Sequence, residues 1–378
     1  MTRSRVELRE EILAFSRREL NPGAAERDRD QCFSLDLWRE CGKLRLQGLL
    51  VPEEYGGLGL NPLEATYALE ALGYGCKDTG LAFAICAHLL ACVVPVWKHG
   101  TEQQKRRYLP GLSDGTIVAA NAMSEPASGS DAFAIATVAH PNELAFRLDG
   151  RKKFVSNGPV SDLILAYAAT DAVTGFHGGV TAFLIPSDTP GVVCGARVDK
   201  MSLRSCQMGD IIYEGAQVPP EFILGRKGGG GPIFAESMEW ERVCLGAIHV
   251  GAMQRILEDC VGYARTRTSS GRPIGKYQAV SHRLADMKVR LEAARELTYK
   301  AASMLGRARE VGLSASIAKL FVSESLLTSA TDAVRVLGGY GIMETGDADR
   351  VFRDAIAATI YSGTSDIQRN IIAKWLGL

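Results

Sequence analysis

The period of the hydrophobic pattern changes twice along this chain, and this change limits the folds that it can adopt. Apolar residues recur at helical spacing across Val6 to Leu20 and across Leu63 to Leu72. From Ile117 onward the pattern is instead one of short apolar runs between turn residues, which is typical of strands. These runs are 163–166, 180–185 and 211–213. Long helical patterns return after residue 231, with apolar positions that step by three and four.

The order of these patterns predicts an α+β multidomain fold. We expect an all-α N-terminal domain at 1–117, a small β-barrel or β-sandwich domain at 118–226 and a C-terminal α-helical bundle at 227–378. Within the middle domain, Asp149-Gly150 predicts a hairpin turn. The glycine run at 228–231 predicts a flexible junction, because it lacks the spacing of a phosphate-binding or dinucleotide-binding loop.

Charge and cysteine content exclude several classes of protein. The chain has 43 basic and 43 acidic residues, and this balance argues against nucleic acid as the main partner. The nine cysteines include no C-x-x-C pair, which predicts neither a metal site nor a disulfide framework. Reduced thiols, together with an N-terminal segment that lacks the apolar core of a signal peptide, predict a cytoplasmic protein.

One apolar segment is long enough to resemble a membrane span. Residues 80–97 contain no Lys, Arg, Asp or Glu. The segment nevertheless includes His88 and Pro95 and is rich in alanine and cysteine. We therefore expect helices buried inside the N-terminal domain and no membrane span.

Several short segments carry residue types that suit a ligand. The hydroxyl-rich turn at 123–131 offers short donors to a flat polar group such as a flavin edge, although a serine-rich loop fits it equally. In the segment 153–158, Phe154 and Ser156 would share one face of a strand. The basic loop at 267–278 suits a pyrophosphate or is a solvated loop. The segments 336–341 and 361–369 suit a ligand or are helix caps.

Together these segments resemble the acyl-CoA dehydrogenase flavoprotein family over nearly the whole chain. The residues that carry the resemblance are 55–59 (YGGLG), 100–105 (GTEQQK), 124–131 (SEPASGSD), 157–158 (NG), Gly271 with Gln278, 337–341 (LGGYG) and 363–369 (GTSDIQR). The resemblance implies a four-helix C-terminal bundle, FAD, an acyl-thioester substrate carried by coenzyme A or a carrier protein, and a homotetramer. It also implies an electron-transferring flavoprotein or another acceptor as the redox partner.

The family motifs also imply which residues hold FAD. Those expected around the flavin ring are Met123, Ser124, Gly129, Ser130, Phe154 and Ser156. Thr364 and Asp366 are expected along the rest of the cofactor. Residues expected to reach the FAD of a neighbouring subunit are Arg267, Gln278, Arg335, Gly338 and Gly339. Ser270 and Arg335 depart from the family pattern, which has an aromatic residue and frequently a glutamine at these positions.

The position of the catalytic base also departs from the commoner pattern. Most members place a glutamate after the tyrosine of Tyr-Glu-Gly-Thr, but this chain has Ser362 there. Isovaleryl- and long-chain-type members carry the base before an arginine of the first long C-terminal helix, which corresponds to Glu241. Glu241 would remove the α-proton while the β-hydride passes to flavin N5. The residues expected to line the substrate site are Cys86, Ser130, Glu239, Arg242, Tyr361, Ser362 and Gly363.

Two other functions remain open at this point. The first is a flavin oxidase or monooxygenase of the same fold, in which the reduced flavin reacts with oxygen. The second is a catalytically silent scaffold that keeps the fold and binds partners. The presence of Glu241 favours the dehydrogenase over the scaffold.

Overall fold

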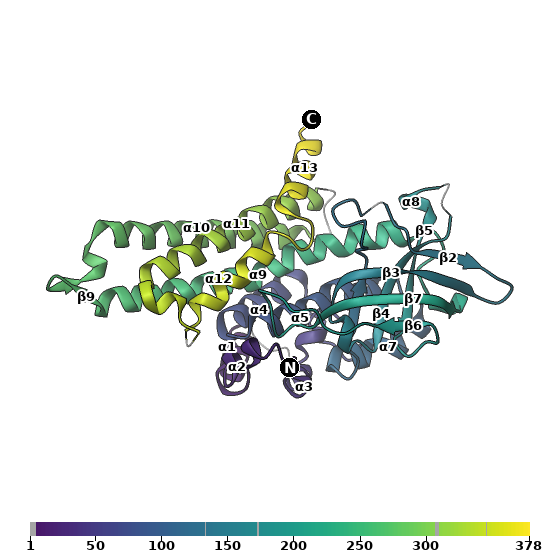
Figure 1. Ribbon diagram of the computed structural model, residues 1–378, viewed down its shortest axis with the longest axis horizontal. Helices are drawn as coiled ribbons and strands as arrows, with labels where there is room; N and C mark the ends of the chain where they lie inside the picture. Colours follow the sequence, from purple (N-terminus) through teal and green to yellow (C-terminus); the bar gives the residue numbers. More distant parts are fainter. Residues whose placement is uncertain (1–4, 133, 172–173, 307–309, 345) are drawn as a thin grey trace.

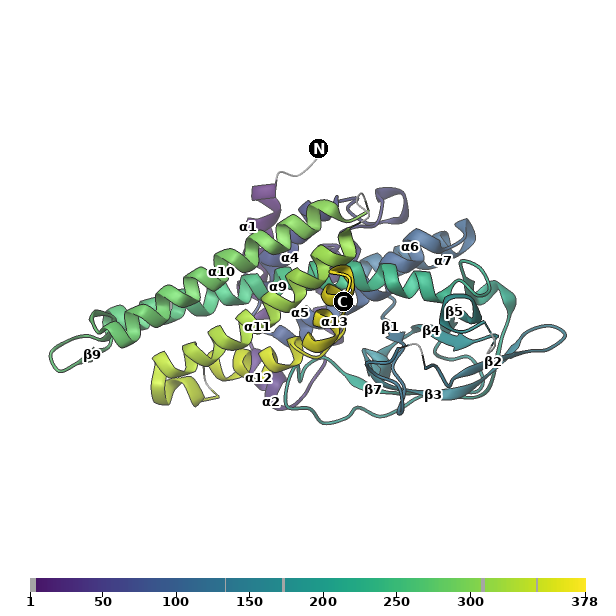
Figure 2. The ribbon, with the colours of Figure 1, turned by 90° about the horizontal axis from the view of Figure 1, so that it is seen from above.

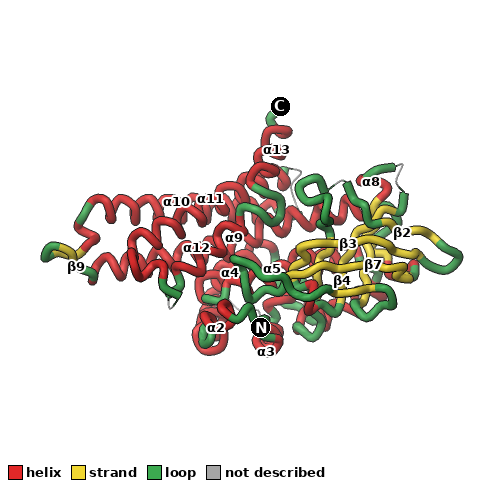
Figure 3. Tube along the Cα trace, viewed as in Figure 1, coloured by secondary structure: helices red, strands yellow, loops and turns green. Residues whose placement is uncertain are grey.

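The computed structural model describes residues 5–132, 134–171, 174–306, 310–344 and 346–378. Helices extend as far as Asp114, the main sheet lies between Ala119 and Leu224, and helices return from Gly230. This order confirms the predicted α+β fold. The molecule is elongated, with long helices at one end and the sheet at the other (Figure 1). Apart from the small β9 hairpin, the strands gather at that one end, as the colours of Figure 3 show.

The N-terminal region is helical and packs against the middle of the molecule. Its helices are α1 (Arg5–Phe15), α2 (Ala24–Arg29), α3 (Leu35–Lys43), α4 (Pro62–Gly75), α5 (Thr79–His88), α6 (Val94–His99) and α7 (Glu102–Asp114). Sequence signals fix several of their ends. The side chain of Asn61 caps α4, and that of Thr101 caps α7, each in a reciprocal capping box with the third residue of its helix.

Two described segments have the length and composition of a membrane span, Thr79–His99 and Val311–Ile342. In the first, 94% of the apolar window is buried inside the protein, where α5 and α6 flank a π-helical turn at Leu89–Val93. This confirms the expectation of buried helices at 80–97. In the second, half of the window is buried.

The middle region is one mostly antiparallel sheet. Its strands are β1 (Ala119–Ala122), β2 (Val138–Pro141), β3 (Phe146–Ser156), β4 (Leu163–Ala169), β5 (Val180–Pro186), β6 (Val192–Cys194), β7 (Met208–Val218) and β8 (Ile223–Leu224). The strand order is β6-β7-β3-β2-β4-β5-β8, with β1 parallel to β4. The three apolar runs identified in the sequence form parts of β4, β5 and β7. The short helix α8 (Phe176–Gly179) leads into β5.

The predicted hairpin turn at Asp149-Gly150 is wrong, because these residues lie inside β3. The register of β3 against β7 shifts between Leu148 and Asp149, and the Asp149 carboxylate accepts a hydrogen bond from the backbone N–H of Gly215. A β-bulge thus takes the residues that would favour a turn. The turn itself lies at 142–145, where the side chain of Asn142 accepts two backbone N–H bonds.

The C-terminal region is a bundle of long helices (Figure 2). It comprises α9 (Gly230–Thr266), a hairpin of β9 (Thr268–Ser269) and β10 (Arg272–Pro273), α10 (Gln278–Met304), α11 (Val311–Leu337), α12 (Ala348–Ala358) and α13 (Ser365–Trp375). With 37 residues, α9 is about 55 Å long and connects the sheet to the far end of the bundle. Both views place the β9 hairpin at that far end.

The glycine run that precedes α9 is packed closely rather than serving only as a flexible junction. A Cβ added at Gly228 would lie 2.4 Å from the carbonyl oxygen of Gly178, and one at Gly230 would lie 2.9 Å from the backbone N of Ala182. Gly228 also has a positive φ of 76°. The glycines therefore let the start of α9 approach the backbone around β5.

Candidate active site

Glu241 lies on α9 and lines a cavity between α9, α11 and the loop after α12. The other residues around this cavity are Arg242, Leu245, Gly246, His249, Lys319, Val322, Ser323, Ala358, Tyr361 and Ser362. The cavity encloses about 230 Å³ of space, part of it continuous with solvent. Glu241, Leu245 and His249 follow one another at steps of four, so successive turns of one helix face form one wall.

The environment of Glu241 is that of a dry base. The residue is 8% exposed, and burial raises the pKa of its carboxyl to about 7. Ser362, Arg242 and Lys319 lie close enough to oppose part of this rise. A carboxyl with a pKa near neutral pH is matched to accepting and releasing a proton.

The loop that holds Ser362 is anchored against α9. The guanidinium Nε of Arg242 donates to the carbonyl oxygen of Ser362 at 3.1 Å, and Gln368 donates to the carbonyl oxygens of both Ser362 and Gly363. Ser362 has a positive φ of 55° and Gly363 one of 86°. The two positions at which the resembling family places its glutamate, 241 and 362, thus line one cavity.

Helix α5 supplies neighbours from the N-terminal region. The ring of Phe83 packs on that of Tyr361, with centroids 4.7 Å apart. Cys86 is fully buried, and its thiol interacts electrostatically with Glu241 and Tyr361. Of the residues expected to line the substrate site, Arg242, Tyr361 and Ser362 line the cavity itself, with Cys86 and Gly363 beside it.

Glu239 and Ser130 lie elsewhere. Glu239 is half-buried, does not line the cavity, and has its carboxylate near Gly312 at the start of α11. Burial and the nearby charge of Glu236 raise its pKa. Ser130 is exposed on the loop that follows β1. Only Glu241 of the two glutamates therefore faces the cavity.

Among the cavity residues that sequence reasoning missed, His249 and Lys319 are the titratable ones. The hydroxyl of Tyr361 lies 2.6 Å from Nε2 of His249. Lys319 is 5% exposed, and its Nζ has no hydrogen-bond partner within the described part of the chain. Burial lowers the pKa of Lys319 to about 8. The spacing of His249 from Glu241, two steps of four on one helix, was the available signal.

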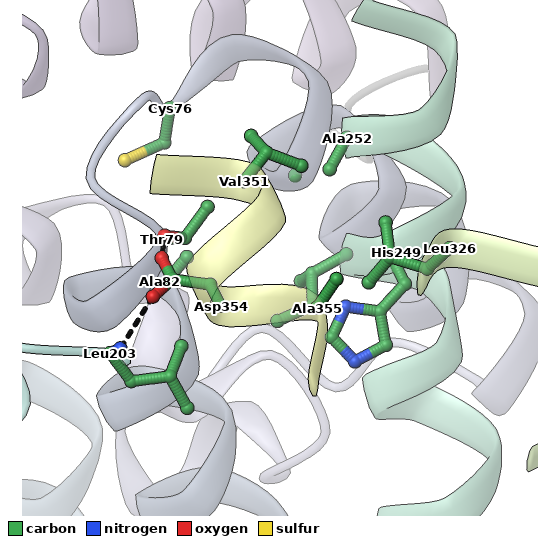
Figure 4. Close-up of a pocket in the computed structure, with 12 residues that line it drawn as sticks. Cys76, Thr79, Ala82, Leu203, His249, Ala252, Leu326, Val351, Asp354 and Ala355 are labelled. Atoms are coloured by element: carbon green, nitrogen blue, oxygen red, sulfur yellow. Dashed lines mark hydrogen bonds between the residues drawn. The ribbon is translucent and has the colours of Figure 1, made fainter. Parts of the chain in front are cut away.

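A second cavity adjoins the first through His249, which lines both. Figure 4 shows it with His249 and Ala252 on one side and Cys76 and Thr79 on the other. The carboxylate of Asp354 on α12 accepts from the backbone N–H of Leu203 and bonds the Thr79 hydroxyl. Burial raises the pKa of Asp354 to about 6. Because its oxygens are bonded, Asp354 ties α12 to α5 and to the loop before β7.

A buried ion pair and its hydrogen bonds hold the loop that is expected to bind the flavin ring. Glu125 and Lys152 form a buried ion pair at 2.7 Å, and the Glu125 carboxylate also accepts from the backbone N–H groups of Ala136 and Thr137. Nζ of Lys152 donates to the carbonyl oxygen of Met123. In this loop Met123 is buried, Ser124 is half-buried, and Gly129 is exposed with no atom within 4 Å of an added Cβ.

Phe154 stands out on β3. Its φ is 59°, its side chain is 59% exposed, and the register against β7 shifts between Lys152 and Val155. An exposed aromatic ring held at a positive φ is a costly feature that tends to occur at ligand sites. Val155 beside it is buried and Ser156 is half-buried, so Phe154 and Ser156 both lie away from the core.

These residues fit a flavin. An exposed ring, serine hydroxyls and an open glycine offer a planar cofactor a stacking surface and short hydrogen-bond donors and acceptors. Thr364 caps α13 through the backbone N–H of Ile367, and Asp366 is exposed in the first turn of that helix. Among the described residues, no group of three His, Cys, Asp or Glu side chains is placed to hold a metal ion.

The remaining cofactor residues lie far from this loop in the same chain. Arg267 and Gln278 are exposed on either side of the β9 hairpin. Arg335, Gly338 and Gly339 are exposed where α11 ends. Because α9 begins beside the sheet and is about 55 Å long, the hairpin at its other end lies at the opposite end of the molecule from the sheet (Figure 1).

All three regions of the chain match the domains of one known protein family. Residues 2–116, 120–216 and 228–377 match the N-terminal, middle and C-terminal domains of acyl-CoA dehydrogenase. An L-prolyl-[peptidyl-carrier protein] dehydrogenase of Pseudomonas fluorescens is 41% identical over 356 residues, which is 94% of this chain and 93% of that protein.

Solved structures give the same picture. The prolyl acyl carrier protein oxidase AnaB superposes with a TM-score of 0.96 at 39% identity, covering 99% of both chains. PigA with FAD and proline superposes with a TM-score of 0.97 at 36% identity, covering 100% of this chain and 98% of that one.

Proposed function

Because the chain belongs to the acyl-CoA dehydrogenase family, we propose that it oxidises a prolyl thioester carried on a carrier protein. Its general class is that of an FAD-dependent dehydrogenase of acyl thioesters, an oxidoreductase that acts on CH–CH bonds. The prolyl group and the carrier are the parts that we propose beyond this class.

The observation that carries the proposal is the buried carboxyl of Glu241. The α-carbon of a thioester is acidified by its carbonyl but still needs a positioned base. Burial holds the Glu241 pKa near 7, so part of the population is ionised at neutral pH and ready to accept that proton. The apolar walls formed by Leu245, Val322 and Ala358 limit access of water to the base.

FAD supplies the acceptor for the β-hydride. We propose that the 123–130 loop, Phe154 and Ser156 hold the flavin ring, with Thr364 and Asp366 along the chain of the cofactor. The ion pair of Glu125 with Lys152 would hold that loop in place when the cofactor binds. Arg242 orients the loop at Ser362, and with it the cavity wall opposite Glu241.

The prolyl assignment rests on the relatives. A curated relative at 41% identity is named for a prolyl group on a peptidyl carrier protein, and the two solved relatives are named for a prolyl carrier protein and for bound proline. A coenzyme A thioester is the alternative that the family name implies.

Anaerobic titration of the purified protein tests this function. The panel is L-prolyl carrier protein, L-prolyl-CoA, butyryl-CoA and isovaleryl-CoA, with bleaching of the flavin absorbance as the signal. We expect L-prolyl carrier protein to bleach the flavin fastest. Faster bleaching by butyryl-CoA or isovaleryl-CoA would show that the prolyl assignment is wrong.

The fate of the electrons is a separate question. An electron-transferring flavoprotein is the acceptor that we propose. Oxidation by oxygen is the second candidate, since one solved relative is named an oxidase. Oxygen consumption by the substrate-reduced protein, measured with and without an electron-transferring flavoprotein, separates the two.

We further propose a cytoplasmic homotetramer. The hairpin beside Arg267 and Gln278 lies at the end of α9 that is remote from the sheet, and a second subunit would bring it to the 123–130 loop of its neighbour. The C-terminal region also exposes large apolar side chains, as an interface requires. These are Val289, Ile317, Phe321, Tyr340, Ile342, Met343, Phe352, Ile360, Trp375, Leu376 and Leu378.

A further inference from the structure

The cavity that Glu241 lines also contains a hydrogen-bonded polar pair that removal of the α-proton does not require. The hydroxyl of Tyr361 and Nε2 of His249 lie 2.6 Å apart, and both residues line the cavity. The ring of Phe83 packs on that of Tyr361 and fixes its orientation. An otherwise hydrocarbon acyl group would meet this hydroxyl without bonding it.

The imidazole of His249 is neutral. Burial and the nearby charge of Lys319 lower its pKa to about 3. A neutral imidazole carries one N–H and one bare nitrogen, so two arrangements of the pair exist. Either Tyr361 donates to Nε2 and its oxygen is free to accept, or Nε2–H donates to Tyr361 and the hydroxyl is free to donate.

Both arrangements suit a secondary amine. The amine N–H bonds the phenol oxygen in the first arrangement, and the amine lone pair accepts the phenol O–H in the second. A cyclopentane ring of the same shape offers neither group, so the phenol keeps only its bond to His249 and its second hydrogen-bonding position has no partner. A site that bonds a substrate N–H discriminates strongly against the analogue that lacks it.

We propose that Tyr361 binds the ring nitrogen of an α-amino acyl thioester and that His249 positions the Tyr361 hydroxyl for this contact. The proposal rests on the proposed function, because it explains how the cavity selects a prolyl group over a hydrocarbon group. Tyr361 touches the substrate, whereas His249 acts through Tyr361 and is a positioning residue.

The experiment compares two thioesters of one shape, L-prolyl and cyclopentanecarbonyl, on the same carrier protein. The second-order rate constant of flavin reduction is measured for each, and their ratio is the readout. The parent protein is compared with Tyr361→Phe, His249→Leu and His249→Gln. Tyr74→Phe is the matched control, since the Tyr74 hydroxyl bonds Glu258 and the residue lines neither cavity.

We expect the prolyl to cyclopentanecarbonyl ratio to fall by about 10- to 100-fold in Tyr361→Phe and His249→Leu. His249→Gln keeps a polar partner for the Tyr361 hydroxyl and should restore part of the ratio. Tyr74→Phe should keep the parental ratio.

The possible failures are distinguishable. If both substrates slow equally in Tyr361→Phe and His249→Leu, the pair is only structural and the inference is wrong, while the proposed function stands. If the parent protein does not reduce its flavin with the prolyl thioester, the proposed function fails and the inference fails with it.

Discussion

At the scale of single residues, two side chains that are adjacent in sequence have different surroundings in the cavity and therefore different roles. Glu241 and Arg242 are adjacent in sequence, yet Glu241 faces the cavity interior and Arg242 donates to the backbone of the Ser362 loop. Within the described part of the chain the Glu241 carboxyl forms no ion pair that would hold it ionised, and burial dominates its pKa. This is the condition that a general base near neutral pH requires.

Glu241→Gln tests that role directly. The amide keeps the shape of the side chain but does not accept the α-proton, so we expect flavin reduction by substrate to fall about 100- to 10,000-fold. Stopped-flow absorbance under anaerobic conditions measures this rate. Ser362→Ala is the control and should change it far less, because a neutral serine is no base at neutral pH. A Glu241→Gln protein that reduces its flavin nearly as fast as the parent would make Glu239 the next candidate.

The same substitution should change stability in a pH-dependent way. The folded pKa of Glu241, about 7, lies above its ordinary value of 4.5, so the native state holds a proton that the unfolded state has released. Stability of the parent therefore falls as pH rises from about 4.5 through 7. Glu241→Gln removes this loss, and we expect a gain of about 1–3 kcal/mol at pH 8 and little gain at pH 5. Denaturant unfolding at the two pH values measures the difference, and an equal effect at both would contradict it.

At the scale of elements, the structure shows where local sequence signals compete with tertiary contacts. The capping residues Asn61 and Thr101 start their helices as local rules predict. Asp149-Gly150, a strong turn signal, is instead absorbed into β3, because pairing with β7 and the bond from Gly215 favour a bulge. The register of β3 against β7 also shifts between Lys152 and Val155, although Phe154 and Ser156 both lie away from the core, as strand alternation predicts. Bulges depend on the partner strand, which sequence alone does not identify.

The buried ion pair of Lys152 with Glu125 should stabilise both the fold and the loop at 123–131. Lys152→Met leaves the Glu125 carboxylate buried without its cation, and we expect a loss of about 3–5 kcal/mol of stability. The loop at 123–131 should also lose order, so FAD should dissociate more readily. Denaturant unfolding and the FAD content after gel filtration measure the two effects. The double change Glu125→Gln with Lys152→Met removes both charges and should recover part of the stability, whereas no recovery would show that the charge imbalance is not the cause.

At the scale of the whole molecule, the sequence predicted more of the fold than of the site. Changes of hydrophobic period depend on each segment alone, so the order of helical and β regions was predictable. The cavity is different, since it joins Phe83, Glu241, Lys319 and Tyr361 from four separate segments. The candidate base was identified through a family pattern, and the helical spacing of His249 from Glu241 was a usable signal. Lys319, by contrast, became visible only when α9, α11 and the loop after α12 were brought together.

Arg267 and Glu241 of one chain would belong to two different FAD sites if subunits share their sites. If Arg267 serves the FAD of a neighbouring subunit, Arg267→Glu spoils the neighbour's site while its own subunit keeps an intact Glu241. Glu241→Gln has the opposite defect, since it keeps Arg267 but loses the base. In a mixed oligomer, the subunit with Arg267→Glu receives a normal Arg267 from its Glu241→Gln neighbour, so intact sites form again.

We therefore expect two inactive proteins to regain activity when they are mixed, unfolded and refolded together. Substrate-driven flavin reduction by the mixture is compared with each variant refolded alone. Because α9 separates the hairpin that follows Arg267 from the sheet end of the same chain (Figure 1), recovery requires that the hairpin of one chain meets the sheet end of another. Without recovery, despite light scattering that shows mixed oligomers, Arg267 either acts within its own chain or does not contact FAD, and the shared site would have to be abandoned.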